Sequence, residues 1–161
     1  MLIEDMTSKE CGEFLNRTGF GRLGCAVDNQ AYLTPIYFAY PPDRLCGFSA
    51  AGQKIHCMRT NPKVCVEVDE VTGHFRWTSV IVRGQYQELP NTAEFASDRL
   101  AAQLGLENRI LWWQTAYAAV QFHGKREPSE PLFYCIHISS MTGRRAIPDA
   151  ADTTFFKISV P

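Results

Sequence analysis

The chain has 161 residues, of which 45% are hydrophobic and 20% charged, and its formal net charge is −1. This composition is typical of one globular domain with a hydrophobic core and excludes a disordered chain. Lys and Arg are scattered along the sequence, which argues against a nucleic-acid partner because such a partner requires a basic patch. No apolar run approaches the ~20 residues of a membrane span, so we expect no membrane partner.

The first residues, MLIEDMTSKECGE, carry acids at Glu4 and Asp5 and lack the basic region and apolar core of a secretory signal. We therefore expect a cytoplasmic protein. Its six cysteines form no CxxC pair and show no zinc-like spacing with histidine, so we expect no metal site. Disulfides are disfavoured in a reducing compartment. We interpret the cysteines in apolar runs as small buried residues: Cys25, Cys65 and Cys135.

The first half of the chain predicts one helix and three strands. Thr-Ser-Lys-Glu at 7–10 fits a capping box, which begins a short helix through about residue 16. GFGRLGCAVD predicts a first strand, the Asp-Asn pair at 28–29 a turn, and AYLTPIYFAY a second strand. Pro35 cannot donate a hydrogen bond to a ladder, so it indicates an edge, a bulge or a neighbour that is not a strand. After a turn at 41–43, RLCGFSA predicts a third strand.

A short helix over about 53–60, closed by Asn-Pro, comes next. Alternating valines in KVCVEVDE predict a half-buried fourth strand, and 71–73 predicts a turn. HFRWTSVIVRGQYQEL predicts a long fifth strand in which Gly84 marks a bulge.

The last third of the sequence predicts helices and one returning strand. The helices run from Asn91 to Leu104 and from Asn108 to about Val120, and 124–131 is a polar loop. LFYCIHIS predicts the last strand, which 141–143 ends. Strands with short turns, then helices, then a returning strand predict an antiparallel α+β barrel.

The segment CGFSAAGQKIHCMRTNPKVCVEVDE contains a candidate anion site. Its turn carries Ser49 and Gly52, and Lys54 lies in the first turn of the helix. Backbone N–H groups, a hydroxyl and an ammonium at a helix N-terminus suit a phosphate. A surface lysine, a serine bonded to its own backbone and an ordinary turn glycine are the alternatives. A cation is unfavourable at a helix N-terminus unless an anion is bound, which favours the phosphate.

Other candidate residues carry less information. The four histidines are dispersed, and none is singled out as a haem ligand. Trp112 and Trp113 are adjacent on a predicted helix and point in different directions, so one could pack in the core and the other cover a planar ligand or a subunit contact. No Ser-His-Asp order, Walker loop or carboxylate pair stands out, so no catalytic residue is assigned.

The run from Gly19 to Leu89 resembles the FMN-binding split barrels of the pyridoxamine 5′-phosphate oxidase-like superfamily, and within it the nitroimidazole-resistance-type flavoproteins. The resemblance rests on GRLGCAVDNQAYLTPIYFAY, FSAAGQKIHCMRTNPKVCVEVDE and WTSVIVRGQYQEL, with MTGRRAI near the end. Its most specific part is the order strand, Ser, Gly-x-Lys, helix, Asn-Pro, strand. It implies one domain over 1–161, an α+β fold with an antiparallel six-stranded split β-barrel and flanking helices.

The resemblance also implies a cofactor site. The FMN phosphate would be held by Ser49, Gln53 and Lys54, and the flavin ring would lie against the second strand with a contact from Ser79. Gln53 stands where the family often has a basic residue, which leaves one fixed cation. The cofactor-binding residues implied in this way are Tyr32, Thr34, Pro35, Ile36, Tyr37, Phe48, Ser49, Gln53, Lys54 and Ser79.

The function implied is an FMN-dependent oxidoreductase acting on a small molecule, of the flavin- or nitro-compound-reductase kind. The reductant would be NAD(P)H, and a homodimer would complete the pocket. No Arg-x-His pair lies near the C-terminus, which argues against pyridoxamine phosphate as the substrate. A non-catalytic flavin-binding protein, a haem-binding split barrel and a structural dimer without cofactor remain as alternatives.

Overall fold

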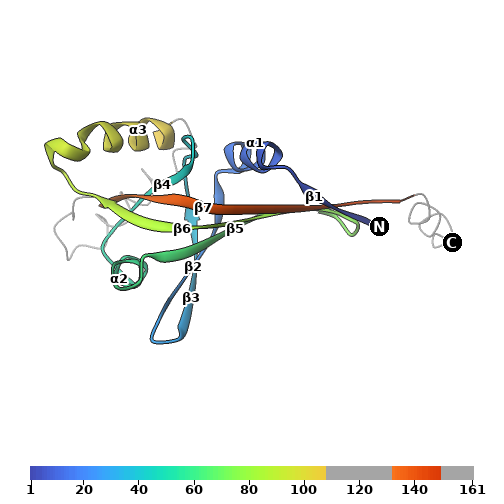
Figure 1. Ribbon diagram of the computed structural model, residues 1–161, viewed down its shortest axis with the longest axis horizontal. Coiled ribbons are helices and arrows are strands. Elements are labelled where there is room, and N and C mark those ends of the chain that lie inside the picture. The colour runs from blue at the N-terminus through green and yellow to red at the C-terminus, as the bar shows by residue number, and fades with distance from the viewer. Residues whose placement is uncertain (108–131, 150–161) are drawn as a thin grey trace, which may run out of the picture.

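The computed structural model describes residues 1–107 and 132–149, and every structural statement below refers to them. The helix predicted from Asn108, the loop predicted at 124–131, and both Trp112 and Trp113 lie outside the described residues. In chain order the elements are β1 Leu2–Met6, α1 Ser8–Thr18, β2 Phe20–Val27, β3 Gln30–Tyr37, β4 Arg44–Ser49, α2 Gln53–Thr60, β5 Lys63–Gly73, β6 Arg76–Leu89, the 3₁₀ turn η1 Ala93–Phe95, α3 Ala96–Glu107 and β7 Leu132–Ile147 (Figure 1).

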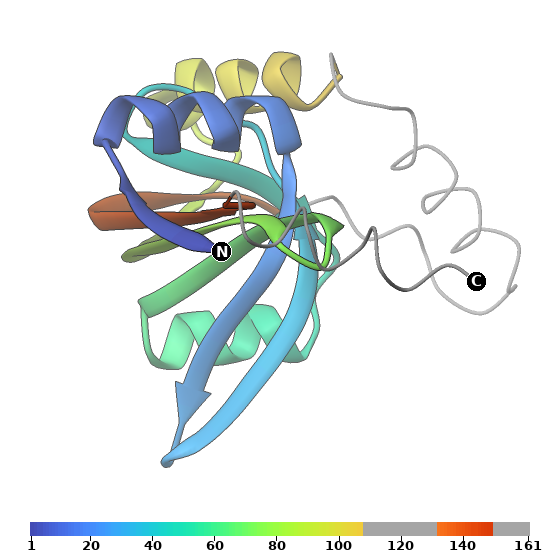
Figure 2. The same cartoon turned by 90° about the vertical axis from the view of Figure 1, so that its right-hand side faces the viewer.

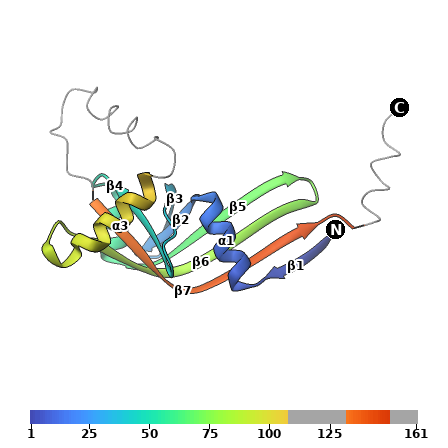
Figure 3. The ribbon, with the colours of Figure 1, turned by 90° about the horizontal axis from the view of Figure 1, so that it is seen from above.

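The strands form one antiparallel sheet in the order β1-β7-β6-β5-β2-β3, and β4 pairs with β7. One edge of β7 is paired along its length with β6, and its other edge carries β4 near the start and β1 near the end. A bridge between Ala39, just after β3, and Cys46 joins the β3 end of this order to β4, which is itself paired with β7. The sheet therefore closes on itself through β4, while β1, β5, β6 and β7 extend to one side (Figure 3).

The predicted α+β barrel is confirmed, but the described residues hold seven strands rather than six. The additional strand is β1, which pairs with the last five residues of β7. Glu4 and Asp5, the N-terminal acids, form ion pairs with Arg145 and Arg144, each at 3.1 Å. Because β1 supplies this partner, β7 continues to Ile147, and the predicted strand end at 141–143 is wrong.

Local signals account for α1 and for the turn after β2. Thr7 Oγ1 accepts a hydrogen bond from the backbone N–H of Glu10 at 3.3 Å, and the Glu10 carboxylate accepts from the Thr7 N–H at 2.8 Å, which confirms the capping box. Asp28 and Asn29 have φ values of 50° and 60°, the left-handed conformation that a tight hairpin turn requires. Both predictions depend on neighbouring residues only.

Two further predictions on the strands are confirmed and one is wrong. β3 ends the main strand path, so Pro35 lies on the edge strand that was one of its three interpretations. The β6–β7 register shifts between Arg83 and Gly84, which confirms the bulge. The turn predicted at 71–73 is part of β5, and the chain turns at 74–75 instead.

Helices α1 and α3 lie on one side of β7 and α2 on the other (Figures 1 and 2). The main core lies inside the curved sheet and is apolar throughout the described residues. A second, smaller cluster lies beside α3. No described helix has the length and apolar character needed to cross a membrane. The members of the main core with 0% exposure are Leu15, Leu23, Leu45, Met58, Val66, Val68, Val80, Val82 and Ile136.

The cysteines differ from the prediction at Cys65, which is half-buried rather than buried, and at one pair. Cys46 and Cys135 are both buried, each 1% exposed, but a disulfide between β4 and β7 joins them. The sequence does not show the pair because 89 residues separate them, and only the register of β4 against β7 places them opposite each other. Cys25 and Cys65 are free thiols.

Candidate functional site

Helix α2 begins after a short loop that follows the end of β4. Its side chains Ile55, Cys57 and Met58 are buried against the core. At its other end, Asn61 Nδ2 donates to the carbonyl oxygen of Ala26 in β2 at 3.0 Å. These contacts fix the helix beside β2 and β3, with its N-terminus next to the end of β4 (Figure 2).

The N-terminus of α2 carries unsatisfied hydrogen-bond donors. Gly52 is the N-cap residue, no side chain caps the helix, and the first turn contains no acid. The first N–H groups of any helix have no partner four residues earlier. A Cβ added at Gly52 would have no atom within 4 Å, so the space in front of these donors is open. A small anion can reach the backbone here.

Lys54 lies at this N-terminus and is half-buried. Burial lowers the pKa of its ammonium group, because desolvation disfavours the charged form. No carboxylate of the described residues pairs with it, although most of the arginines do have such partners. A desolvated cation beside the positive end of a helix is unfavourable alone, and a bound anion would compensate it.

The other two residues predicted to hold the phosphate lie on the same segment. The Ser49 hydroxyl donates to the carbonyl oxygen of Ala50 at 2.7 Å, so this serine bonds to its local backbone, which is the alternative to a phosphate contact. This hydroxyl oxygen keeps its acceptor capacity, but its hydrogen is engaged. Gln53 is exposed at the start of α2. Phe48 is half-buried with its ring 5.9 Å from that of Phe133.

The five predicted residues of β3 are divided between two faces. Tyr32, Thr34 and Ile36 lie on the core side, and Ile36 is only 4% exposed. Pro35 and Tyr37 lie on the opposite face and are exposed. Because successive strand residues alternate between faces, one planar ligand cannot contact all five side chains. The outward pair is the accessible part of this prediction.

Ser79 lies on β6, three strands away from β3 in the sheet order. Its hydroxyl donates to Glu67 Oε1 at 3.1 Å, and Glu67 also pairs with Arg22 at 3.2 Å. Ser79 lines a cavity of about 580 Å³ between β1, β6 and β7, and none of these strands carries another predicted site residue. The cavity is also lined by Trp77, Ile81, Met141, Arg144 and Asp5.

Sequence reasoning did not find this cavity. Trp77 and Ser79 are two residues apart on one strand, so the sequence does place them on one face. The remaining wall comes from β1 and the end of β7, which pair with each other. Without the N-terminal strand, nothing in the sequence brings Asp5 beside Arg144.

A family model described as pyridoxamine 5′-phosphate oxidase matches residues 7–145. The chain belongs to this family. An uncharacterized protein of Rhizobium meliloti (strain 1021) is 36% identical over 146 residues, which cover 91% of this chain and 97% of that protein. The resemblance found in the sequence is thereby confirmed.

Solved structures of other proteins share the fold. The crystal structure of an FAD-binding protein from Mesorhizobium loti superposes with a TM-score of 0.76 at 35% identity, covering 92% of this chain and 99% of that one. A candidate 5-nitroimidazole antibiotic resistance protein from Bacteroides thetaiotaomicron superposes with a TM-score of 0.62 at 16% identity, covering 92% and 93%. At that identity the second likeness shows the fold alone.

Proposed function

We propose that this chain binds a flavin nucleotide, FMN, and transfers electrons to a small-molecule substrate with NAD(P)H as reductant. The observation that carries the proposal is Lys54, a half-buried ammonium at an uncapped helix N-terminus without a carboxylate partner in the described part of the chain. The related protein from Mesorhizobium loti is described as FAD-binding, which supports a flavin as the anion.

The residues present fit a phosphate group. The Lys54 ammonium would supply charge, and the first N–H groups of α2 would donate hydrogen bonds to the phosphate oxygens. Gln53 would add an amide donor from an exposed position. A phosphate could approach the backbone beside Gly52, because no atom lies within 4 Å of the position that a Cβ at Gly52 would take.

A flavin ring attached to that phosphate would need an accessible surface. The outward face of β3 offers Pro35 and Tyr37, and the Tyr37 ring packs on that of Phe20 with centroids 4.7 Å apart. Tyr32, Thr34 and Ile36 would support this strand from the core side. When bound, the flavin would supply the electron-transfer chemistry, and the protein would bind and orient it.

FMN and FAD share the phosphate next to the ribityl chain, so the α2 site would accept either. We keep FMN as the proposal because the N-terminus of α2 provides a site for one phosphate group, and FAD is the alternative to be measured. The proposed compartment is the cytoplasm.

A second copy of this chain is the proposed partner. Large apolar side chains are exposed along the extended part of the sheet, which is typical of a surface that another chain covers. The cavity that Ser79 lines would lie in this region. The exposed side chains in this part of the sheet are Leu2 (54%), Ile3 (55%) and Val71 (68%).

The absorption spectrum of the purified protein, before and after addition of FMN or FAD, tests the proposal. A flavin band near ~450 nm that stays with the protein through gel filtration is the expected result. A Soret band would indicate the haem-binding alternative. Oxidation of NADH or NADPH by the flavin-loaded protein then separates an oxidoreductase from a flavin carrier.

A further inference from the structure

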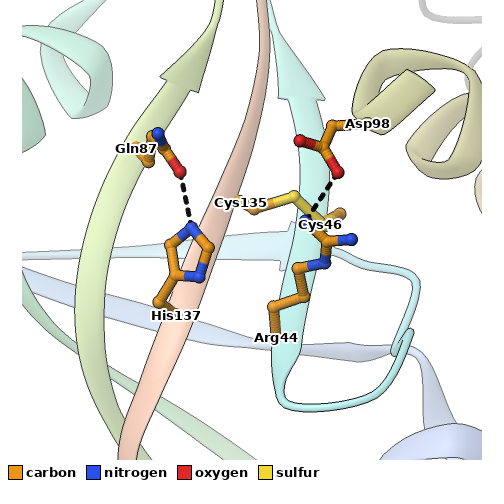
Figure 4. Close-up of a disulfide and its surroundings, with 6 residues drawn as sticks. All are labelled: Arg44, Cys46, Gln87, Asp98, Cys135 and His137. Atoms are coloured by element: carbon orange, nitrogen blue, oxygen red, sulfur yellow. Dashed lines mark hydrogen bonds and ion pairs between the residues drawn. A yellow bond between two sulfur atoms is a disulfide. The ribbon is translucent and has the colours of Figure 1, made fainter. Parts of the chain in front are cut away.

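Cys46 of β4 and Cys135 of β7 face each other in the strand register and form a disulfide with a Cα–Cα distance of 4.1 Å (Figure 4). The other four cysteines are free thiols. We propose that this disulfide is a reversible redox site, reduced by small thiols, that sets how firmly β4 and the following phosphate-binding segment are held to the sheet. Only its effect on flavin affinity rests on the proposed function.

The disulfide lies where β4 is attached least. β4 has six residues and a full ladder only with β7. On its other edge β4 makes a single bridge, in which Cys46 and Ala39 exchange two hydrogen bonds of 2.8 and 2.9 Å. Cys46 therefore closes the barrel on both edges of β4. A covalent link at this point restrains the strand more than it would in the middle of a sheet.

Strand β4 leads directly to the candidate phosphate site. Ser49 ends β4 three residues after Cys46, and α2 begins at Gln53. The open N-terminus of α2 and Lys54 thus depend on where β4 ends. When the disulfide is reduced, β4 keeps its hydrogen bonds but loses its covalent link, so local opening of this segment becomes easier.

Helix α3 covers the disulfide and is weakly anchored. Within α3 only Ala102 and Leu106 are buried, while Leu100 and Leu104 are 56% and 51% exposed. An ion pair of 2.9 Å between Arg44 and Asp98 ties the helix to β4 (Figure 4). A helix with so few buried side chains opens at low cost, which gives an external thiol a route to the sulfurs. The small cluster around the disulfide also contains Leu89, Phe95 and Phe133.

Arg99 supplies two further contacts of α3. Its guanidinium donates to the carbonyl oxygen of Leu89 at 2.8 Å and lies 4.9 Å from the centre of the Phe133 ring. Both contacts lie at the surface of the cluster, so they break when α3 moves away.

The reaction is thiol–disulfide exchange. The thiolate of a glutathione-type thiol attacks one sulfur, the Cys46–Cys135 bond breaks, and a mixed disulfide forms. A second external thiolate attacks the mixed disulfide. The two external thiols lose two electrons and become a disulfide, and Cys46 and Cys135 each leave as a thiol. Oxidised glutathione drives the reverse reaction. In a reducing compartment a protein disulfide is typically redox-sensing rather than structural.

The test starts with the native full chain equilibrated in glutathione buffers from oxidising to reducing. The samples are quenched in acid, unfolded and alkylated, and intact mass counts the thiols. The four free cysteines should react after oxidation and all six after reduction, with return to four on reoxidation. Six labels in every buffer, or four even under strong reductant, would overturn the proposal.

Hydrogen exchange measures the structural consequence without flavin. Amides of 44–54 should exchange about fivefold faster in the reduced protein, while those of β2 should not change. The double variant Cys46→Ala/Cys135→Ala should match the reduced protein in every buffer. If that variant does not fold, the exchange rates of the oxidised and the reduced wild-type protein still test the proposal. Equal exchange in the two states contradicts the proposal.

FMN titration of both states separates this inference from the proposed function. Affinity should fall by about fivefold on reduction. Equal affinity in both states would refute the coupling. If exchange changes but FMN binds to neither state, the redox site stands and the FMN proposal fails.

Discussion

Gly47 of β4 lies directly opposite Tyr134 of β7, and a Cβ at Gly47 would lie 2.8 Å from the Tyr134 hydroxyl oxygen. The Tyr134 side chain is 1% exposed, so its ring has no room to move away. We expect Gly47→Ala to lower the free energy of unfolding by about 1–3 kcal/mol, because it overpacks the core. Urea unfolding measures this. Gly52→Ala is the control, since no atom lies within 4 Å of its added Cβ. Equal loss in both variants would contradict the account.

The Tyr134 hydroxyl is buried, and no hydrogen-bond partner is found for it among the described residues. Burial raises the pKa of Tyr134, since the charged form would be desolvated. Tyr134→Phe should therefore leave the free energy of unfolding unchanged or raise it by up to about 1 kcal/mol. Tyr86→Phe is the matched control. It loses a 2.9 Å hydrogen bond to Glu88 and should destabilise by about 1 kcal/mol. A clear destabilisation by Tyr134→Phe would show that its hydroxyl has a partner.

Glu10 should make the stability depend on pH in the acid range. Hydrogen bonds from the backbone and hydroxyl of Thr7, and from Arg145, lower the pKa of its carboxyl from 4.5 to about 2. As the pH falls, the Glu10 carboxylate takes up a proton in the unfolded chain before it does so in the folded chain. The stabilisation by ionised Glu10 is therefore complete above about pH 4.5 and is lost as the pH falls to about 2. Glu10→Gln should flatten the acid side of a stability–pH curve. Glu13→Gln, on the same helix, should follow wild type, and a Glu10→Gln curve parallel to wild type would refute this role.

The parts of the fold that the sequence predicts correctly depend on neighbouring residues. The capping box of α1, the Asn-Pro end of α2 and the turn at 28–29 are all of this kind. β1 could not be predicted because its strand forms by pairing with Ala146 and neighbouring residues, about the whole chain length away. The Cys46–Cys135 disulfide depends on strand register in the same way.

In the candidate site, too, residues that are close in sequence are predicted better than residues that are far apart. Ser49, Gln53 and Lys54 are close in sequence, and the structure keeps them on one segment at the start of α2. Ser79 is predicted from the family pattern, and the structure places it in a cavity between β1, β6 and β7. The sequence already indicates that the predicted β3 residues cannot all face one ligand, because strand residues alternate between two faces.

The Arg44–Asp98 ion pair should control access to the disulfide. Asp98→Asn weakens the attachment of α3 to β4, so the native protein should be reduced by glutathione about two- to fivefold faster. Timed alkylation followed by mass analysis measures the rate. Glu70→Gln removes the ion pair with Arg17, on α1, and should leave the rate unchanged. Reduction of Asp98→Asn at the wild-type rate would refute access by movement of α3.

We propose that the Lys54 ammonium binds the phosphate of FMN at the N-terminus of α2. Fluorescence titration with FMN, comparing wild type with Lys54→Ala and with the exposed-lysine control Lys63→Ala, tests it most directly. We expect Lys54→Ala to weaken binding by more than ~1 kcal/mol, about fivefold, and Lys63→Ala to bind like wild type. Equal FMN affinity in all three proteins would remove Lys54 from the site and contradict the account.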